Sequence, residues 1–257
     1  MNIHASAVVS PHAEIGPDVM IGPYSSIGDY VTIGQGTDIG AHVVIEGHTH
    51  IGERNKIYHF SSLGTPPQDV GYRGEETRLM IGNDNVIREY TSINRATTKE
   101  NWKTVINNNN YIMAYAHIAH DCVLGDGIIM SNAATLGGHI SIGDNAIIGG
   151  LAAVHQFVRI GAHAFVGGMT GVDKDVPPFL MASGARAKLY GVNQKGLVRS
   201  GFSRETIDGL KRAYRIIWRG NRKVDEGIEE VKRDIGLFPE LEMLLDFLDG
   251  SKRGILR

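Results

Sequence analysis

The sequence predicts a parallel β-helix over residues 1–183, followed by a small α-helical domain over residues 184–257. Three observations lead to this prediction. Aliphatic residues recur at every sixth position, two insertions interrupt the recurrence, and the pattern turns helical after Pro178. The chain also holds 33 glycines in 257 residues. That share exceeds the usual level of about 7% and indicates many tight turns or close backbone approaches.

The six-residue period fits neither an α-helix nor a simple alternating strand. It is typical of short strands separated by turns, with three hexads in one coil and parallel strand pairing between coils about 4.8 Å apart. We therefore expect about nine to ten coils stacked as a triangular prism. Aliphatic columns fill the inside, and Gly and Asn occupy corners where positive φ is easy. The repeating positions are Ile3, Val9, Ile15, Ile21, Ile27, Ile33, Ile39, Ile45, Ile51, Ile57, Leu63, Ile81, Ile87, Ile93, Ile106, Ile112, Ile118, Leu124, Met130, Leu136, Ile142, Ile148, Val154, Ile160, Val166 and Val172.

Two segments break the repeat and are expected to leave the prism as excursion loops, near residues 64–80 and 95–104. Loops on a rigid scaffold often carry function. Beyond the repeat, Ser203 is a plausible helix N-cap and Pro239 suits a first helical turn. The expected helices span about 193–200, 203–219, 224–235 and 239–248.

The net charge of −2 is unevenly distributed. Residues 184–257 hold 16 Lys/Arg and 11 Asp/Glu, whereas residues 1–183 hold 10 and 17. The basic part suits an anionic partner, such as nucleic acid, phosphate groups or an acidic carrier protein, or else is a solvated helix face. The single cysteine, Cys122, excludes an internal disulfide, and no apolar run is long enough to span a membrane. We expect a cytoplasmic protein.

Stacking at eighteen residues gathers four histidines at one edge of the prism. Ile118, Leu136 and Val154 form one column, and each histidine lies within three residues of it. Three interpretations stay open: a decorated surface, a zinc site built from three imidazoles, or a general base beside polar substrate contacts. The histidines are His117, His120, His139 and His155.

Two neighbours of His120 bear on these alternatives. Gly138 follows His120 by one coil. Because Gly138 has no side chain, a thioester could approach it closely, and its N–H could face a developing oxyanion. The alternative is that Gly138 only makes a tight corner. Asp121 would point away from His120 if strand alternation held, which leaves its role open. Because no carboxylate or cysteine completes an obvious ligand shell, no metal is expected.

At these residues the chain resembles the LpxA family, the UDP-N-acetylglucosamine 3-O-acyltransferases of bacterial lipid A synthesis, over its whole length. The resemblance implies a left-handed β-helix and a homotrimer with sites between prisms. It implies transfer of a 3-hydroxyacyl chain from acyl carrier protein to UDP-N-acetylglucosamine, the first step of lipid A biosynthesis, without a cofactor. The resemblance therefore implies that the anionic partner of the basic residues is not nucleic acid. The matching strings are His-Ile-Ala-His-Asp at 117–121, Gly-His at 138–139, Ala-Val-His-Gln-Phe at 153–157, Ile-Gly-Ala-His at 160–163, Asp-Val-Pro-Pro at 175–178, Gly-Val-Asn at 191–193, Arg-Ser-Gly-Phe-Ser at 199–203 and Arg-Gly-Ile at 253–255.

The resemblance also implies roles for individual residues. His120 would be the general base, Gly138 would supply the oxyanion N–H, and Gly168 would set the length of the acyl chain. The basic helices would meet the acidic carrier protein. The implied substrate-binding residues are Asp69, His117, His139, His155, Gln156, Asn193 and Arg199.

One departure concerns the acceptor sugar. The family often has Gln-Asp-Leu-Lys-Tyr where this chain has Gln-Asp-Val-Gly-Tyr at 68–72, so Gly71 replaces the usual lysine, and Arg73 is placed to substitute for it. The change leaves open a 3-amino UDP-sugar acceptor and an amide product. Remoter alternatives are a zinc lyase of the γ-carbonic anhydrase type, a sister N-acyltransferase and a non-catalytic β-helix. The sister class usually has a domain before the prism, whereas the repeat here begins at Ile3.

Overall fold

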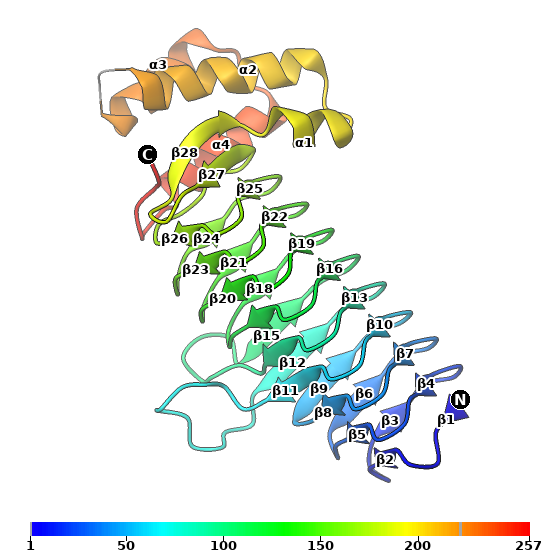
Figure 1. The fold of residues 1–257 in the computed structure, drawn as a ribbon. Helices are drawn as coiled ribbons and strands as arrows, with labels where there is room; N and C mark the ends of the chain where they lie inside the picture. Colours follow the sequence, from blue (N-terminus) through cyan, green and yellow to red (C-terminus); the bar gives the residue numbers. More distant parts are fainter. Residues whose placement is uncertain (1, 221–222) are drawn as a thin grey trace.

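The chain forms a left-handed parallel β-helix capped by helices, as the sequence predicts (Figure 1). The computed structural model describes residues 2–220 and 223–257. Within these residues three sheets, here called A, B and C, form the faces of the prism, with 11, 9 and 8 strands. From β1 to β26, paired strands are three positions apart in the chain, so each coil contributes one strand to each face; β27 then pairs with β25 and, antiparallel, with β28.

The strands are short, mostly of two residues. Sheet A holds β1 (Asn2–Ile3), β4 (Met20–Ile21), β7 (Asp38–Ile39), β10 (Lys56–Ile57), β13 (Val86–Ile87), β16 (Tyr111–Ile112), β19 (Ile129–Met130), β22 (Ile147–Ile148), β25 (Phe165–Val166), β27 (Leu180–Ser183) and β28 (Lys188–Val192). Sheet B holds β2 (Val8–Val9), β5 (Ser26–Ile27), β8 (Val44–Ile45), β11 (Ser62–Thr65), β14 (Ser92–Asn94), β17 (His117–Ile118), β20 (Thr135–Leu136), β23 (Ala153–Val154) and β26 (Gly171–Val172). Sheet C holds β3 (Glu14–Ile15), β6 (Val31–Ile33), β9 (His48–Ile51), β12 (Arg78–Ile81), β15 (Lys103–Ile106), β18 (Val123–Leu124), β21 (Ser141–Ile142) and β24 (Arg159–Ile160).

The two predicted excursions leave the prism while the aliphatic positions stay in register, although the β11–β14 pair has an irregularity of register beside the first excursion. The first excursion loop (residues 66–77) joins β11 to β12, and the second excursion loop (residues 95–102) joins β14 to β15. Ile57 still pairs with Ile87 and Ile93 with Ile118, although the separations exceed eighteen residues. Figure 1 shows both loops leaving the prism on the same side. The aliphatic column is therefore continuous through both insertions.

Close approach, more than positive φ, explains why glycine follows so many of the aliphatic residues. The left-handed corner positions are mostly held by other residues, among them Tyr24 and Phe60, although Gly36 also takes one. The expectation that Gly and Asn would serve those corners was thus only partly right. At Gly34 an added Cβ would lie 2.5 Å from the carbonyl carbon of Gly52 on the next coil. A side chain there would push two coils apart.

The helical cap agrees with the predicted helices. Ser203 accepts the N–H of Thr206 at 3.0 Å as the predicted N-cap, and Pro239 begins the last helix. The prediction did not include the π-helical turn η1. The predicted boundary between residues 183 and 184 stays a prediction, and the antiparallel β27–β28 pair spans it. The helices are α1 (Gln194–Arg199), α2 (Arg204–Tyr214), η1 (Arg215–Arg219), α3 (Val224–Asp234) and α4 (Pro239–Asp249).

The chain end returns to the prism and fastens the cap. Asp175 and Ile255 form a parallel bridge, and the Asp175 carboxylate accepts hydrogen bonds from Ser251 Oγ and the Arg159 N–H, both at 2.8 Å. Among the described helices, none has both the length and the apolar character needed to cross a membrane.

We predict that Gly34→Ala destabilises the prism by about 1–3 kcal/mol, the usual cost of overpacking. The matched control is Gly28→Ala, because a Cβ at Gly28 would lie 3.3 Å from its nearest neighbour, Glu46 Cα. Urea unfolding of both variants measures the difference. Equal urea midpoints for the two variants would show that the close approach of neighbouring coils is not the reason for glycine at position 34.

Candidate functional site

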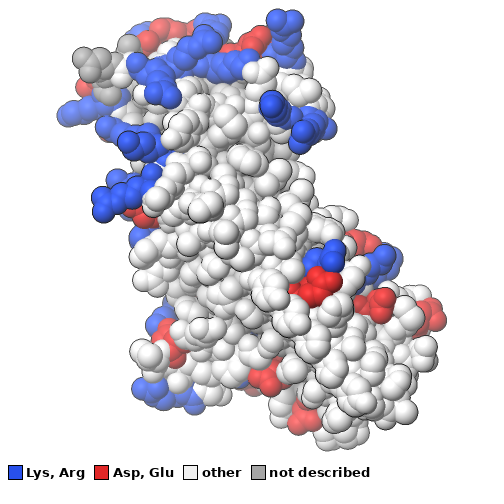
Figure 2. Space-filling model, viewed as in Figure 1, with Lys and Arg blue, Asp and Glu red and all other residues white. Residues whose placement is uncertain are grey.

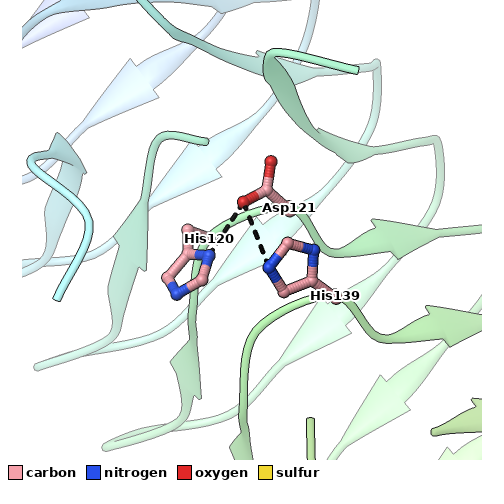
Figure 3. A group of neighbouring side chains, drawn as sticks. All are labelled: His120, Asp121 and His139. Atoms are coloured by element: carbon pink, nitrogen blue, oxygen red, sulfur yellow. Dashed lines mark hydrogen bonds and ion pairs between the residues drawn. The ribbon is translucent and has the colours of Figure 1, made fainter. Parts of the chain in front are cut away.

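The histidine corner is the prism edge between sheets B and C, at residues 119–121, 137–139 and 155–157. Figure 3 shows its centre, where the rings of His120 and His139 flank the carboxylate of Asp121. His120 Nδ1 lies 2.8 Å from Asp121 Oδ2, and His139 Nε2 lies 3.8 Å from the same oxygen. The three side chains are almost fully buried, with 11%, 1% and 3% of their surfaces exposed in the order His120, Asp121, His139.

The expectation that Asp121 points away from His120 was wrong. Asp121 does not continue the strand β17, because it takes a left-handed conformation with φ of 59° at the corner. Strand alternation therefore does not apply to it. The turn brings its carboxylate back onto the imidazole of the residue before it.

The carboxylate determines which nitrogen of His120 is available. An ionised carboxylate only accepts hydrogen bonds, so Nδ1 carries the hydrogen and Nε2 keeps its lone pair. Among the described residues, Nε2 of His120 has no hydrogen-bond partner. The pair is thus arranged as a base with a fixed tautomer.

Four interactions hold the buried Asp121 in its ionised form. Thr97 donates its hydroxyl to Oδ2 at 2.6 Å and its N–H to both carboxylate oxygens at 3.1–3.2 Å. Burial alone would raise the pKa of Asp121, but the hydrogen bonds from His120 and Thr97 bring it below its ordinary value. Asp121 therefore stays negative at neutral pH and holds the imidazole in place.

Gly138 packs directly against the ring of His120, as predicted. An added Cβ would lie 2.5 Å from His120 Cε1 and 2.9 Å from Nε2, so any side chain would displace the imidazole. Within the described chain, the N–H of Gly138 has no acceptor, whereas the flanking Gly137 and His139 donate to the neighbouring coils. A free N–H beside a free imidazole nitrogen can polarise a carbonyl while the imidazole accepts a proton from a nucleophile.

The remaining histidines differ in their surroundings. His139 stacks on Phe157 with ring centroids 4.5 Å apart, and its Nδ1 lies 3.3 Å from a carboxylate oxygen of Glu100. His117 Nδ1 lies 2.8 Å from Ser92 Oγ. Burial and the nearby His120 lower the pKa of His117, so His117 is neutral at pH 7.

His155 is exposed and is held by the chain terminus. Arg253 donates to Nδ1 of His155 at 2.8 Å and to the carbonyl of Asp173 at 2.8 Å. A guanidinium is always a donor, so Nδ1 accepts and Nε2 of His155 carries the hydrogen. The Gln156 carbonyl also lies near Nδ1, but at 3.2 Å it is the weaker contact. His120 and His155 therefore present opposite tautomers.

Asp69, from the first excursion loop, pairs with Lys99 of the second. The Lys99 ammonium forms an ion pair with Asp69, and the Gly71 N–H donates to the same carboxylate at 2.7 Å. These two contacts lower the pKa of Asp69. Arg73 instead bonds to the carbonyls of its own loop, at Val70 and Tyr72. Sequence reasoning missed Lys99 because its partner is 30 residues away.

The resemblance assigns Gln156, Asn193 and Arg199 to the nucleotide. Gln156 lies at the histidine corner, whereas the other two lie on another face of the prism. Asn193 and Arg199 line a hollow of about 900 Å³ against Ile147 and Phe165 on the outer surface of sheet A. In a triangular prism, that face is opposite the corner between sheets B and C. Gly168 lies at the corner between sheets A and B. One chain therefore does not bring these residues to His120.

Asn193 also has a structural task. Its side chain caps α1 through the N–H of Gly196 at 3.2 Å and donates to the carbonyl of His163 at 3.0 Å. Its role in nucleotide binding stays a prediction. Arg199 is exposed in the last turn of α1, so its side chain is accessible to a ligand.

The side chains of the corner centre are close enough to bind a metal, since the ligand atoms of His120, Asp121 and His139 lie within 4.8 Å of one another. However, Asp121 already accepts hydrogen bonds from His120 and Thr97, which an ion would have to replace. The arrangement favours acid–base chemistry over metal chemistry.

Comparisons with known proteins agree with this geometry. A family model described as UDP N-acetylglucosamine O-acyltransferase, domain 2, matches residues 175–256, and the bacterial transferase hexapeptide model matches residues 12–47 and 103–138. The chain is 54% identical to the acyl-[acyl-carrier-protein]–UDP-N-acetylglucosamine O-acyltransferase of Thermodesulfovibrio yellowstonii, with 99% of each chain covered. The protein of the same name from Syntrophobacter fumaroxidans is 49% identical, with full coverage of both chains. The solved structure of LpxA from Acinetobacter baumannii superposes with a TM-score of 0.97 at 44% identity, also over 100% of both chains.

We predict that Asp121 contributes stability that disappears in acid. Because its folded-state pKa is lowered, its contribution is present above the ordinary Asp value of about 3.9 and is lost as pH falls through the folded value. Wild type should thus be more stable than Asp121→Asn at neutral pH, with the gap shrinking in acid. Urea unfolding across pH measures this, with the exposed Asp173→Asn as a control expected to show no such gap. A gap that widens in acid would contradict the assignment.

Proposed function

The chain belongs to the UDP-N-acetylglucosamine O-acyltransferase family, and on that premise we propose that it moves a 3-hydroxyacyl chain from acyl carrier protein to the 3-hydroxyl of UDP-N-acetylglucosamine. This reaction belongs to lipid A biosynthesis. The relatives are named O-acyltransferases, so they support the ester product and not the amide of the 3-amino alternative. The protein is an acyl-[acyl-carrier-protein]–UDP-N-acetylglucosamine O-acyltransferase.

The observation that carries the mechanism is the hydrogen bond from His120 Nδ1 to Asp121. It leaves Nε2 of His120 free to take the proton from the sugar 3-hydroxyl as its oxygen attacks the thioester carbonyl. Asp121 then stabilises the imidazolium that forms. The new C–O bond forms, the C–S bond breaks, and the proton on Nε2 passes to the departing carrier thiolate.

Gly138 is the proposed oxyanion donor in this reaction. The tetrahedral intermediate places negative charge on the former carbonyl oxygen, and an N–H aimed at that oxygen stabilises it. The free N–H of Gly138 beside the His120 ring supports this role. The absent side chain leaves space for the thioester to reach both groups.

The other site residues are proposed as substrate contacts, in two groups. One group lies at or beside the histidine corner and the other lies near sheet A. Asp69 and the three histidines are proposed to contact the sugar and the acyl chain, whereas Gln156, Asn193 and Arg199 are proposed to hold the nucleotide. Gly168 sets the acyl length in this proposal, because it lies exposed at the corner between sheets A and B. The first group is Asp69, His117, His139, His155 and Gln156, and the second is Asn193, Arg199 and Gly168.

A homotrimer would unite the two groups. One chain separates them on different faces of its prism, so a complete site needs the histidine corner of one chain to meet sheet A of a neighbour. A ring of three prisms gives each corner such a neighbour and closes with cyclic symmetry. The location in the cytoplasm stays a prediction.

The acyl carrier protein is proposed to bind at the helical cap. Figure 2 shows Lys and Arg side chains gathered over the cap, with a few acidic residues among them, whereas charges of both signs are scattered over the rest of the visible face. Residues 186–223 carry 11 basic and 2 acidic side chains. A positive surface attracts an acidic partner and raises its association rate, more so at low salt.

We predict that His120→Ala lowers kcat by about 10²–10⁴-fold, the usual contribution of a general base. The assay follows acyl transfer from 3-hydroxyacyl carrier protein to UDP-N-acetylglucosamine, with several chain lengths. His12→Ala is the matched control, because His12 is an exposed histidine of the first coil, far from the site in the chain. Retained turnover in His120→Ala would rule out the mechanism.

We predict that two inactive variants restore each other when mixed. His120→Ala removes the proposed base from the histidine corner, and Arg199→Ala removes a proposed nucleotide contact near sheet A. In a mixed oligomer, a site is intact where the Arg199→Ala chain supplies the corner with His120 and the His120→Ala chain supplies Arg199. Co-expressed chains should regain partial turnover, whereas separately purified variants should not. Absence of any recovery in verified mixed oligomers would contradict a site shared between chains.

A further inference from the structure

The second excursion loop covers the histidine corner from outside the prism. It leaves the prism after β14 of sheet B and returns in β15 of sheet C. β14 lies one coil before β17, the strand that leads into His120. The loop is fastened at its start, where Asn94 donates to Thr65 Oγ1 and to the Pro66 carbonyl, both at 3.0 Å. Arg95 donates to the Gly64 carbonyl at 2.7 Å. These contacts link the two excursion loops.

Thr97 is the first loop residue that reaches the site. It is 3% exposed, and both its N–H and its hydroxyl donate to the Asp121 carboxylate. The hydroxyl contact at 2.6 Å is on Oδ2, the oxygen that also accepts from His120. Thr97 and His120 therefore share one acceptor oxygen of Asp121.

Lys99 is the second residue of this loop that contacts a proposed site residue. Its ammonium pairs with Asp69, whose side chain is only 11% exposed, so the first excursion loop is held against the second by a charge contact. The Asp69 carboxylate is close enough to His120 for their charges to interact. The Lys99 side chain itself is 58% exposed, which leaves part of the ammonium accessible to a ligand.

We propose that the second excursion loop is a positioning element of the acyl-transfer site, in which Thr97 orients the base through Asp121 and Lys99 holds Asp69 for the acceptor. This inference rests on the proposed function. Thr97 acts on the chemical step, because it fixes the geometry of the base. Lys99 acts on acceptor binding, because it orders a carboxylate that faces the sugar.

The two residues are tested by how their variants change kcat and KM. Thr97→Val should lower kcat by roughly tenfold, the loss expected for one hydrogen bond to a charged group, with KM for UDP-N-acetylglucosamine within about twofold. Thr97→Ser keeps the hydroxyl and should stay near wild type. Lys99→Met should raise that KM by roughly tenfold with kcat within about threefold.

Two controls separate positioning from a general loss of structure. Lys103→Met removes a lysine that directly follows the loop, at the start of β15. Its exposed side chain makes no hydrogen bond or ion pair in the described chain, so the variant should change neither constant. In an Asp121→Asn background, Thr97→Val should have little further effect, because residues acting through a shared partner are not additive. Thermal unfolding of each variant checks that the fold is retained.

The outcomes separate this inference from the function on which it rests. If wild type transfers no acyl group, the proposed function fails. If wild type turns over and the two loop variants match it, only the loop inference fails. A drop in kcat for Thr97→Val that persists in full in the Asp121→Asn background also overturns it.

Discussion

Parallel hydrogen bonds between successive coils hold every strand in register with the strand below, and the site depends on that register. His117 pairs with Thr135 and Ile118 with Leu136, which places Gly138 over the ring of His120. A slip by one residue would remove Gly138 from this position and would turn the aliphatic residues of the shifted strand outward. The buried aliphatic column makes such a slip costly, because each coil contributes three apolar side chains to it.

The histidine corner combines a rigid scaffold with a buried charge. Asp121 is buried, and an unpaired carboxylate in such surroundings would be strongly destabilising. Hydrogen bonds from His120 and Thr97 compensate for its lost hydration. The hydrogen bond between His120 and Asp121 also fixes the tautomer of His120. Stability and reactivity at this corner therefore rest on one set of contacts.

Most of the fold followed from periodicity. The six-residue repeat predicted the prism, the two interruptions predicted the excursion loops, and helical spacing with Ser203 and Pro239 predicted the cap. The contacts within the site were harder to predict from the sequence. Asp121 was misread because a corner residue in the left-handed region does not obey strand alternation. Lys99 was missed because loops carry no period, so nothing in the sequence aligns it with Asp69.

The sequence alone determined the repeat, the stacking of residues eighteen apart and hence the meeting of His120 with Gly138, because these depend only on a regular geometry that extends from coil to coil. Only the tertiary structure decided what the irregular segments do. It turned Asp121 onto His120, brought Lys99 to Asp69 and separated Asn193 and Arg199 from the histidines. The physical reason is that the paths of the loops and of the chain end are set by contacts between distant segments, whereas the coil is set by local spacing.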